Sequence, residues 1–343
     1  MGTAGINLDR VTRWLTDNIE GVEAPFTFSP IAGGHSNLTF AVTDRVGRKL
    51  VLRRPPLAAV LATAHDMVRE HRVITAFGNT PVACPTTLGL CTDEGVNDAP
   101  FYVMDFVEGV VLHDRAITAE TLPLDQRVSL SESVIDTLAA LHTADPDEIG
   151  LGDLGRRSGY LERQLNRWQG QWEKTKTREL AEMDRTYALL LEALPEEKYN
   201  TVVHGDYRLG NMLITPGTGQ VAAVLDWELC TLGDPLADLG YLLNNWVEPG
   251  EADQVAGATD FPTADGGFMT RDQLIDRYVD KTGFEVQNPD YYRAFQFWRL
   301  GAIVEGVLSR YMKGALDNEV DLDAFRVQID SLASKAIELA EGM

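Results

Sequence analysis

The chain has 343 residues, enough for two compact lobes or one large domain. Hydrophobic residues make up 44% and charged residues 24% of it, which is the balance of an ordinary globular protein. The formal net charge of -22 argues against nucleic acid or an anionic membrane as a partner, because both require a basic surface. No apolar run approaches the roughly 20 residues of a membrane helix, and the first residues lack a signal-peptide pattern. We therefore expect a cytoplasmic protein with no membrane partner.

The first 105 or so residues predict a helix followed by a small antiparallel sheet. Apolar residues at helical spacing predict a helix over 8–19, with Asn7 in position to cap it. Short apolar runs separated by glycines and polar residues, such as 93–98, predict strands joined by turns. The predicted strands cover 26–31, 38–43, 49–53, 86–91 and 100–106, and one helix over 63–77 interrupts them.

After residue 108 the pattern becomes mostly helical. The predicted helices cover 125–143, 158–174, 178–194, 235–246, 271–283, 289–313 and 322–341. Residues 201–225 add three short β runs, and 244–268, rich in Gly, Pro, Asp and Ala, predicts a long surface loop. The sequence thus predicts a bilobal α+β fold, with a small sheet-rich lobe over 1–106 and a larger helical lobe over 107–343. Ligands favour the interface between such lobes.

The segment TVVHGDYRLGNMLI, residues 201–214, carries the strongest chemical signal. An apolar strand delivers His204 and Asp206, and the following loop delivers Asn211. The spacing H-x-D-x-x-x-x-N is that of kinase catalytic loops. A second apolar strand ends at Asp226 and Glu228 after a turn at 216–219. We expect Asp206, Asn211 and Asp226 to converge at one end of this hairpin system.

These residue types match the needs of phosphoryl transfer, which requires positioning and neutralisation of charge. One carboxylate must orient the attacking hydroxyl and accept its proton, and Asp206 is the candidate. Magnesium prefers oxygen ligands, which Asn211 and Asp226 can supply for one or two ions. Each residue alone would also suit a turn, a cap or a left-handed loop position. We expect His204 to be structural, bonding the loop backbone.

Two segments carry a family resemblance: VVHGDYRLGNML, and VLDWELCTLGDPLADLGY after it. They are similar to the aminoglycoside phosphotransferase and choline kinase-like family. More narrowly, they resemble the kinase-like domain that occurs alone or fused to acyl-CoA dehydrogenases, over roughly residues 26–340. The resemblance implies a protein-kinase-like fold that binds ATP between its lobes, with Asp238 tethering the catalytic loop. The residues alone allow Asp238 simply to favour the dipole of the helix that it begins.

The resemblance also implies the reaction: transfer of the ATP γ-phosphoryl group to a hydroxyl of a small molecule. The family's acceptors include aminoglycosides, choline-like alcohols and sugars. For the dehydrogenase-linked branch a metabolic alcohol or a hydroxyacyl-CoA is expected. The alternative is a nucleotide-binding pseudokinase or regulatory module without transfer activity.

The first lobe departs from the kinase pattern at its phosphate-binding cation. The strand KLVLRR offers no lysine at the expected place, so Arg53 is our choice and Arg54 the alternative. Alternation places Val51 on the same face as Arg53, where it would line an adenine pocket. Glu70 lies on an apolar helical stripe, and a buried carboxylate there needs Arg53 as its partner. The alternative is an exposed Glu70 that pairs locally with a neighbouring arginine.

Two further segments are candidates for nucleotide contacts. The loop 31–37 contains Gly33 and Gly34, which let backbone amides approach a phosphate, and Ser36 or Asn37 can add a donor. A plain hairpin turn is the alternative for this loop. Residues 101–107 read as the last strand leading into a hinge, where Met104, Asp105 and Val107 would contact adenine.

The acceptor side is predicted from position alone. Glu228, Tyr241 and Arg299 are candidates for substrate contacts, because they belong to segments expected near the catalytic loop. Aromatic residues at helical spacing are more often core than ligand contacts.

Overall fold

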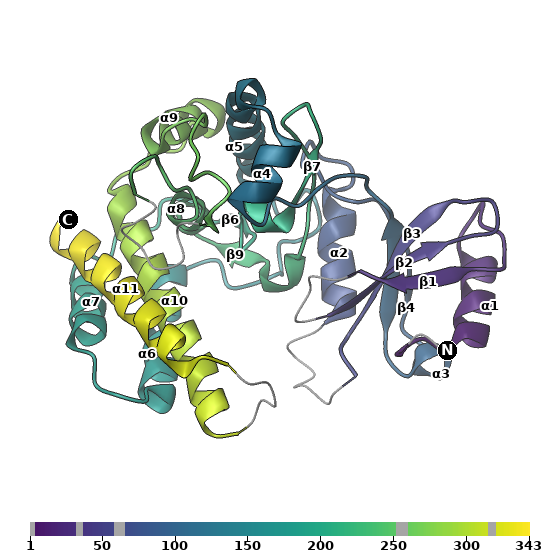
Figure 1. Cartoon of the computed structure of the whole chain (residues 1–343), viewed down its shortest axis with the longest axis horizontal. Coiled ribbons are helices and arrows are strands. Elements are labelled where there is room, and N and C mark those ends of the chain that lie inside the picture. Colours follow the sequence, from purple (N-terminus) through teal and green to yellow (C-terminus); the bar gives the residue numbers. More distant parts are fainter. Residues whose placement is uncertain (1–3, 32–36, 58–65, 252–259, 315–319) are drawn as a thin grey trace. The chain divides into compact units, whose positions relative to one another are not determined.

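The computed structural model describes residues 4–31, 37–57, 66–251, 260–314 and 320–343 (Figure 1). The chain divides into two compact units. The first contains Met1–Gly109 and Ala222–Cys230, and the second contains Val110–Val221 and Thr231–Met343. The sequence places 222–230 in the helical lobe, whereas the structure packs this segment within the first unit.

Local contacts explain this difference. The backbone N–H of Val224 donates to the carbonyl of Ala83 at 2.8 Å. The Trp227 ring is fully buried and stacks on Phe77, with 5.1 Å between ring centroids. The segment Ala222–Cys230 is thus held by contacts with Ala83 and Phe77 of the first unit. The division into a nucleotide-binding lobe over 1–106 and a catalytic lobe over 107–343 stays a prediction.

The first unit is built on a five-stranded antiparallel sheet of order β1-β2-β3-β5-β4. Each predicted strand lies within one residue of an observed one at both ends. The observed strands are β1 (Thr27–Pro30), β2 (Leu38–Thr43), β3 (Lys49–Arg54), β4 (Thr87–Cys91) and β5 (Phe101–Asp105).

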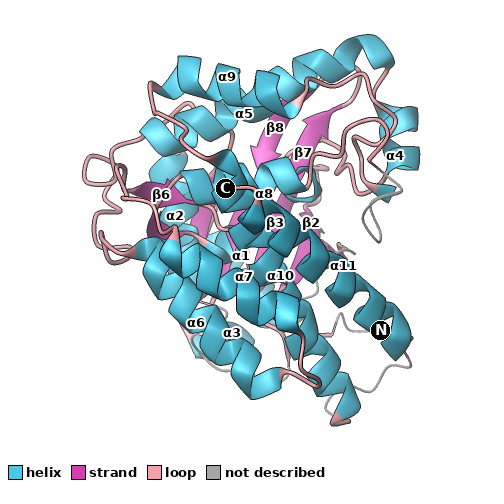
Figure 2. Ribbon diagram, turned by 90° about the vertical axis from the view of Figure 1, so that its left-hand side faces the viewer, coloured by secondary structure: helices cyan, strands magenta, loops and turns pink. Residues whose placement is uncertain are grey.

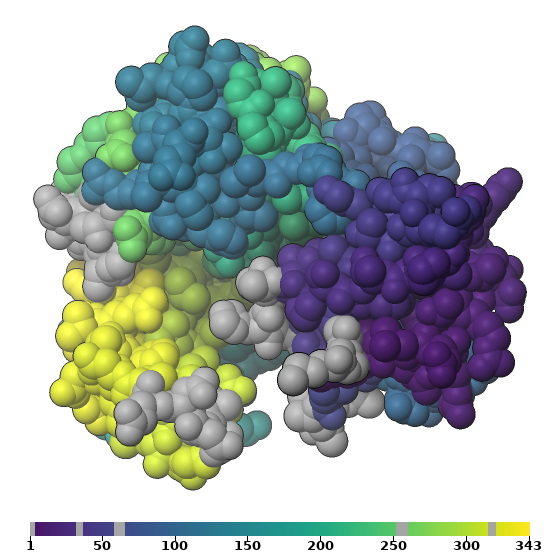
Figure 3. All heavy atoms as spheres, turned by 45° about the vertical axis from the view of Figure 1, so that its right-hand side comes forward, coloured from purple at the N-terminus to yellow at the C-terminus, as the bar shows by residue number. Residues whose placement is uncertain are grey.

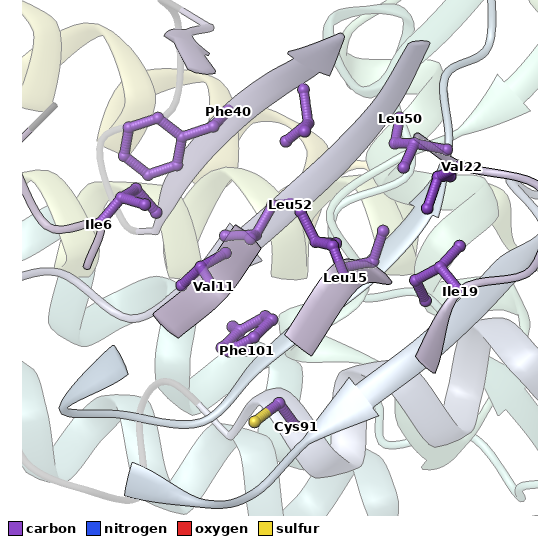
Figure 4. Close-up of a cluster of buried hydrophobic side chains, with 12 residues drawn as sticks. Ile6, Val11, Leu15, Ile19, Val22, Phe40, Leu50, Leu52, Cys91 and Phe101 are labelled. Carbon is purple, nitrogen blue, oxygen red and sulfur yellow. The ribbon is translucent and has the colours of Figure 1, made fainter. Parts of the chain in front are cut away.

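One face of this sheet is covered by α1 (Leu8–Asn18). As predicted, the Asn7 side chain caps this helix, accepting from the backbone N–H of Arg10 at 3.3 Å. The helix buries Val11 and Leu15 in an apolar cluster with sheet residues such as Leu52 (Figure 4). Because neighbouring residues of a strand point to opposite faces, the other face is left to Val51 and Arg53.

The remaining helices of the first unit are α2 (Met67–Phe77), α3 (Glu94–Asn97) and the short 3-10 helix η3 (Trp227–Leu229). Asp66 caps α2 by accepting from the N–H of Arg69 at 2.9 Å; residues 63–65 of the predicted helix lie outside the described residues. The predicted polar turn at 93–98 is instead the short helix α3, because Asp93 caps it at the N–H of Gly95.

The second unit is mostly helical, with α10 packing against four of its other helices. Figure 2 shows the helical character of this unit, and Figure 3 shows α11, the yellow end of the chain, at its surface. Its longer helices are α4 (Arg115–Thr121), α5 (Arg127–Thr143), α6 (Tyr160–Thr175), α7 (Ala181–Glu192), α8 (Leu236–Asn244), α9 (Arg271–Thr282), α10 (Pro289–Met312) and α11 (Leu322–Glu341). The described part of this unit also contains the 3-10 helices η1 (Leu124–Gln126) and η2 (Leu209–Asn211). Within the described ranges, no helix has both the length and the apolar content to cross a membrane.

Short strands carry the loops of interest. β6 (Thr201–Val203) pairs antiparallel with β9 (Thr231–Gly233), a strand that the sequence did not predict. β7 (Met212–Thr215) and β8 (Gln220–Val224) form a second two-stranded sheet. β9 has three residues, of which the last is a glycine, so it shows no apolar run or alternation and becomes visible only through its pairing with β6.

The predicted surface loop over 244–268 is anchored at both of its ends. Residues 252–259 of it lie outside the described residues. Before this gap, Trp246 is 1% exposed and its Nε1 donates to the carbonyl of Met269 at 2.9 Å. Beyond it, the hydroxyl of the fully buried Thr263 donates to the carbonyl of Val247 at 2.9 Å. The ends of the segment are therefore part of the packed second unit.

The α1 face of the sheet supports the first unit, so truncating it should be costly. Leu15→Ala, at a fully buried position, is expected to lower the free energy of unfolding by about 2–5 kcal/mol. Leu8→Ala in the same helix, where the side chain is 41% exposed, is expected to change it by less than about 0.5 kcal/mol. Urea denaturation followed by circular dichroism measures both, and equal effects would contradict the packing described here.

Candidate functional site

In the first unit, β3 and α2 bring Arg53 and Glu70 together. Nε of Arg53 lies 3.2 Å from Oε1 of Glu70. The Glu70 side chain is 2% exposed and that of Arg53 13% exposed, so the ion pair is shielded from water. The structure thus has the pairing that the apolar stripe around Glu70 predicts, and not the exposed alternative.

Arg53 also reaches a second carboxylate. Its Nη2 lies 2.7 Å from Oδ1 of Asp226, whose side chain is 32% exposed. Asp226 follows β8 and has a left-handed backbone, with φ of 63°. Residues other than glycine enter this region at a cost, and such strain is concentrated at functional sites. We call Arg53, Glu70, Tyr102 and Asp226 the first-unit cluster.

Burial sets the electrostatics of this cluster. It raises the pKa of Glu70 to about 7, and the carboxylates of Asp226 and Glu228 add to the rise. Arg53 and the Tyr102 hydroxyl oppose it. Burial alone would lower the pKa of Arg53, but Glu70, Tyr102 and Asp226 outweigh it and raise that pKa. The Arg53 guanidinium therefore stays charged and is fixed between the carboxylates of Glu70 and Asp226.

Tyr102 is a member of the cluster that the sequence did not single out. It is fully buried on β5 and stands directly across the ladder from Arg53. Burial, followed by the nearby Glu70, raises its pKa well above the usual range. The signal available in the sequence was alternation, since Tyr102 and Met104 share one face of a predicted strand.

Arg54, the alternative cation, serves the other face of the sheet. Its side chain contacts the carbonyls of Gly5, Pro55 and Asn97, the last two at 3.1 and 3.3 Å. It is 5% exposed, and burial lowers its pKa. Of the two candidates, Arg53 is therefore the one that lies with the carboxylates.

The other predicted nucleotide contacts fall in three places. Val51 and Met104 are cross-strand partners, each 7% exposed, on the face of Arg53. Asp105 ends β5; its N–H donates to the carbonyl of Thr86, and its carboxylate lies 3.4 Å from the Arg48 guanidinium. Val107, two residues later, is partly exposed. Gly33, Gly34 and Ser36 lie outside the described residues.

Asn37, from the same loop, is described and almost fully buried. Its Nδ2 donates to Oε2 of Glu228 at 3.2 Å. The side-chain donor that the sequence offers to a phosphate is therefore engaged by Glu228. This contact also places Glu228, a candidate for substrate contact, among residues of the first unit.

In the second unit, residues 204–211 form the candidate catalytic loop between β6 and β7. The N–H groups of His204 and Gly205 donate to the Asp238 carboxylate at 2.6 and 2.8 Å. Gly205 has φ of 85°, a conformation that glycine adopts without strain. Nδ1 of His204 accepts from the N–H of Asp206 at 3.2 Å. His204 and Asp238 therefore make the backbone contacts that their predicted structural roles require.

Asp206 is held by its own loop. Nδ2 of Asn211 donates to Oδ2 of Asp206 at 2.6 Å and to its carbonyl at 2.9 Å. Nε of Arg208, a residue that the sequence did not single out, lies 3.3 Å from Oδ1 of Asp206. The carboxylate remains 24% exposed. It is thus fixed in direction but open to a reactant.

Tyr241 and Arg299 surround the same loop. Burial raises the pKa of Tyr241, and its contact with the Asp206 carboxylate adds to the rise. Nη2 of Arg299 donates to the carbonyl of Gly205 at 3.3 Å, and its guanidinium lies 5.7 Å from the Trp168 ring centroid. Both predicted substrate residues therefore lie against the residues that flank Asp206.

The fold and these contacts define a kinase-like phosphotransferase. The sequence model described as the phosphotransferase enzyme family matches residues 27–269, and the chain belongs to that family. A solved structure from Ralstonia eutropha JMP134, provisionally assigned as an aminoglycoside phosphotransferase, superimposes with a TM-score of 0.84. It is 31% identical and covers 97% of this chain and 98% of its own. The predicted protein-kinase-like α+β fold is confirmed.

More distant structures share the fold alone. Spectinomycin phosphotransferase in complex with ADP and spectinomycin is 10% identical, with a TM-score of 0.63 over 97% of this chain and 99% of its own. The complex of aminoglycoside phosphotransferase APH(4)-Ia with AMP-PNP and hygromycin B is 17% identical, with a TM-score of 0.59 over 97% and 99%.

Curated relatives are larger proteins. Mouse acyl-CoA dehydrogenase family member 10 is 33% identical over 282 residues, which are 82% of this chain and 26% of the relative. Human acyl-CoA dehydrogenase family member 11 is 29% identical over 322 residues, 93% of this chain and 40% of the relative. The chain thus spans two fifths or less of the length of these relatives.

Asp234, just before α8, yields a prediction for pH dependence. Burial raises its pKa to about 6, although the N–H of Leu236 and the hydroxyl of Tyr292 donate to it. An acid whose pKa is raised on folding stabilises the fold at low pH, and this contribution is lost as the pH rises through 6. When the pH is lowered from 7 to 5, the free energy of unfolding of the wild-type protein should rise by about 1 kcal/mol more than that of Asp234→Asn. Urea denaturation at both pH values measures the difference, and a gap that does not change with pH would contradict the assignment.

Proposed function

We propose that this chain transfers the γ-phosphoryl group of ATP to a hydroxyl of a small molecule, with Mg²⁺ as cofactor. The observation that carries the proposal is the Asp206–Asn211 bond of 2.6 Å, which fixes an accessible carboxylate in the catalytic loop. Membership of the phosphotransferase enzyme family supports the class of reaction. The complexes of structural relatives with ADP or AMP-PNP support ATP as the donor.

In the proposed mechanism, Asp206 orients the acceptor hydroxyl and takes its proton as the oxygen attacks the γ-phosphorus. The bond from the γ-phosphorus to the bridging oxygen of ATP breaks, and ADP leaves. Arg208 and Asn211 hold one carboxylate oxygen each, which limits the directions in which Asp206 can present its lone pairs. Asp238 fixes the loop backbone by accepting from the N–H groups of His204 and Gly205. This chain's contribution is therefore mainly positioning, as phosphoryl transfer requires.

Asn211 and Asp226 are the proposed ligands of Mg²⁺. The amide nitrogen of Asn211 faces Asp206, which leaves its oxygen for a cation, and Asp226 has a carboxylate oxygen besides the one that Arg53 contacts. Hard oxygen donors of this kind fit Mg²⁺. Bound Mg²⁺ would supply neutralisation of charge on the phosphates.

Arg53 is the proposed partner of the ATP phosphates. Glu70 holds one edge of its guanidinium, so that little side-chain freedom remains to be lost on binding. Arginine offers a planar fork of donors where kinases have a lysine, and such a fork suits phosphate oxygens. Val51 and Met104 are proposed to line the adenine pocket, with Asp105 and Val107 at the hinge.

The proposed acceptor is a metabolic alcohol or a hydroxyacyl-CoA, an inference supported by the names of the curated relatives. Tyr241 and Arg299 are the proposed contacts on the acceptor side, because both lie against the loop that carries Asp206. Glu228 remains a candidate for a substrate contact. We further propose that the reaction takes place in the cytoplasm.

One observation favours a second candidate, a nucleotide-binding module without transfer activity. Arg53 stands in place of lysine and engages Asp226 at 2.7 Å, so a proposed metal ligand already has a partner. If that pair persisted with nucleotide bound, metal binding would be weakened. The two candidates differ in Mg²⁺-dependent turnover of ATP.

Removing the proposed base tests the transfer function. Asp206→Asn is expected to lower Mg²⁺-dependent ATP turnover about 10²–10⁴-fold while nucleotide affinity is retained, because the amide cannot accept the proton. Phosphorus NMR follows turnover, and calorimetry measures affinity. Asp272→Asn, at an exposed position on α9, is the control and should behave as wild type. Retained turnover in Asp206→Asn would refute its role as base.

The two neighbouring arginines provide a matched test of the phosphate contact. Arg53→Gln is expected to weaken binding of Mg²⁺ and AMP-PNP at least about tenfold, because a charge-assisted contact to phosphate is lost. Arg54→Gln should lower stability but leave affinity within about twofold, since its bonds go to backbone carbonyls. Calorimetric titration measures the affinity of both variants for AMP-PNP with Mg²⁺. If Arg54→Gln weakened binding more than Arg53→Gln, the phosphate contact would belong to Arg54.

A further inference from the structure

Behind the candidate catalytic loop, buried polar side chains connect three helices. The hydroxyl of Tyr278 on α9 lies 2.8 Å from Nδ1 of His142 on α5. Nε2 of His142 lies 3.3 Å from Oδ2 of Asp238 on α8. The His142 side chain is 0% and that of Asp238 2% exposed, and Tyr278 is fully buried. Figure 2 shows α9 running alongside α5, as their packing requires.

The partners of the Asp238 carboxylate give these contacts their direction. The Asp238 carboxylate only accepts, so Nε2 of His142 must donate to it. At its other nitrogen, Nδ1, the His142 ring shares a hydrogen bond with the Tyr278 hydroxyl. The Asp238 carboxylate also receives the backbone N–H groups of His204 and Gly205. The relay therefore runs from Tyr278 through His142 and Asp238 to the catalytic loop.

The relay fixes the orientation of Asp238. Oδ1 takes the N–H of Gly205, whereas Oδ2 is shared between the N–H of His204 and Nε2 of His142. Burial raises the pKa of Asp238, but His142, His204 and the N–H of Gly205 outweigh it, and the pKa is lowered. A charged carboxylate is thus held in place by donors on two opposite sides, the loop and α5.

We propose that His142 and Tyr278 are positioning residues, an inference that rests on the proposed phosphotransfer. They hold Asp238 in place, and Asp238 in turn holds the backbone of the loop that presents Asp206. Neither residue touches Asp206, and each acts through the next member of the relay. Arg299 contacts the carbonyl of Gly205 at 3.3 Å, whereas the backbone N–H groups of His204 and Gly205 donate to Asp238. Loosening Asp238 should therefore let the loop backbone shift.

Tyr278→Phe tests the relay, because it removes one hydroxyl and keeps the ring that packs against His142. The backbone N–H groups of His204 and Gly205 are expected to exchange with deuterium roughly tenfold faster in this variant. The kcat of Mg²⁺-dependent ATP turnover is expected to fall about 10- to 100-fold, with KM for ATP unchanged, since a small displacement of the base is costly. Residue-resolved hydrogen exchange and steady-state kinetics measure the two effects.

Tyr291→Phe is the matched control. Tyr291 is also buried in the second unit, and its hydroxyl donates to the carbonyl of Leu190 at 3.1 Å, outside the relay. It should lose stability as Tyr278→Phe does, but leave kcat and the exchange of His204 and Gly205 as in wild type. If both variants behave alike in kcat and exchange, the positioning role is overturned. If wild-type protein shows no turnover, the phosphotransfer proposal fails, while the exchange data still report whether the relay holds the loop.

Discussion

A buried carboxylate must be neutralised by fixed donors, and this constraint organises each unit separately. Leaving an ionised side chain unpaired in a protein interior costs several kcal/mol. In the first unit, Glu70 meets the constraint through Arg53, which ties α2 to the central strand of the sheet. In the second unit, Asp238 meets it through the backbone of the catalytic loop and His142. Arg53 is held by Glu70, and the loop that carries Asp206 is held by Asp238. The contacts that neutralise the two buried carboxylates therefore also orient the side chains with proposed chemical roles.

The sequence predicts most of this, for identifiable reasons. Strands that alternate between two buried faces and helices with an apolar stripe carry periodic signals, so β2, β3 and α1 are predicted within one residue at each end. The choice of Arg53 over Arg54 follows from the same alternation, once the face toward α2 is known. The spacing from His204 to Asn211 is local, so it needs no knowledge of the fold.

What the sequence does not predict depends on contacts between distant segments. Tyr102 joins the first-unit cluster because β5 pairs with β3. His142 and Tyr278 join the relay because α5 packs against α9 and His142 also contacts Asp238 on α8. The packing of 222–230 with the first unit likewise depends on Trp227 finding Phe77, 150 positions earlier in the chain. None of these partners is marked by spacing, since buried tyrosine, histidine and tryptophan most often serve the core.

The proposed function requires that the protein bind a nucleotide together with Mg²⁺. Calorimetric titration of the wild-type protein with AMP-PNP, in the presence of Mg²⁺ and again with excess EDTA, measures this binding. We expect saturable binding of one equivalent with Mg²⁺ and a loss of at least about tenfold in affinity without it, because the proposed metal ligands, Asn211 and Asp226, are hard oxygen donors that suit Mg²⁺. Absence of Mg²⁺-dependent nucleotide binding would refute the proposed phosphotransfer.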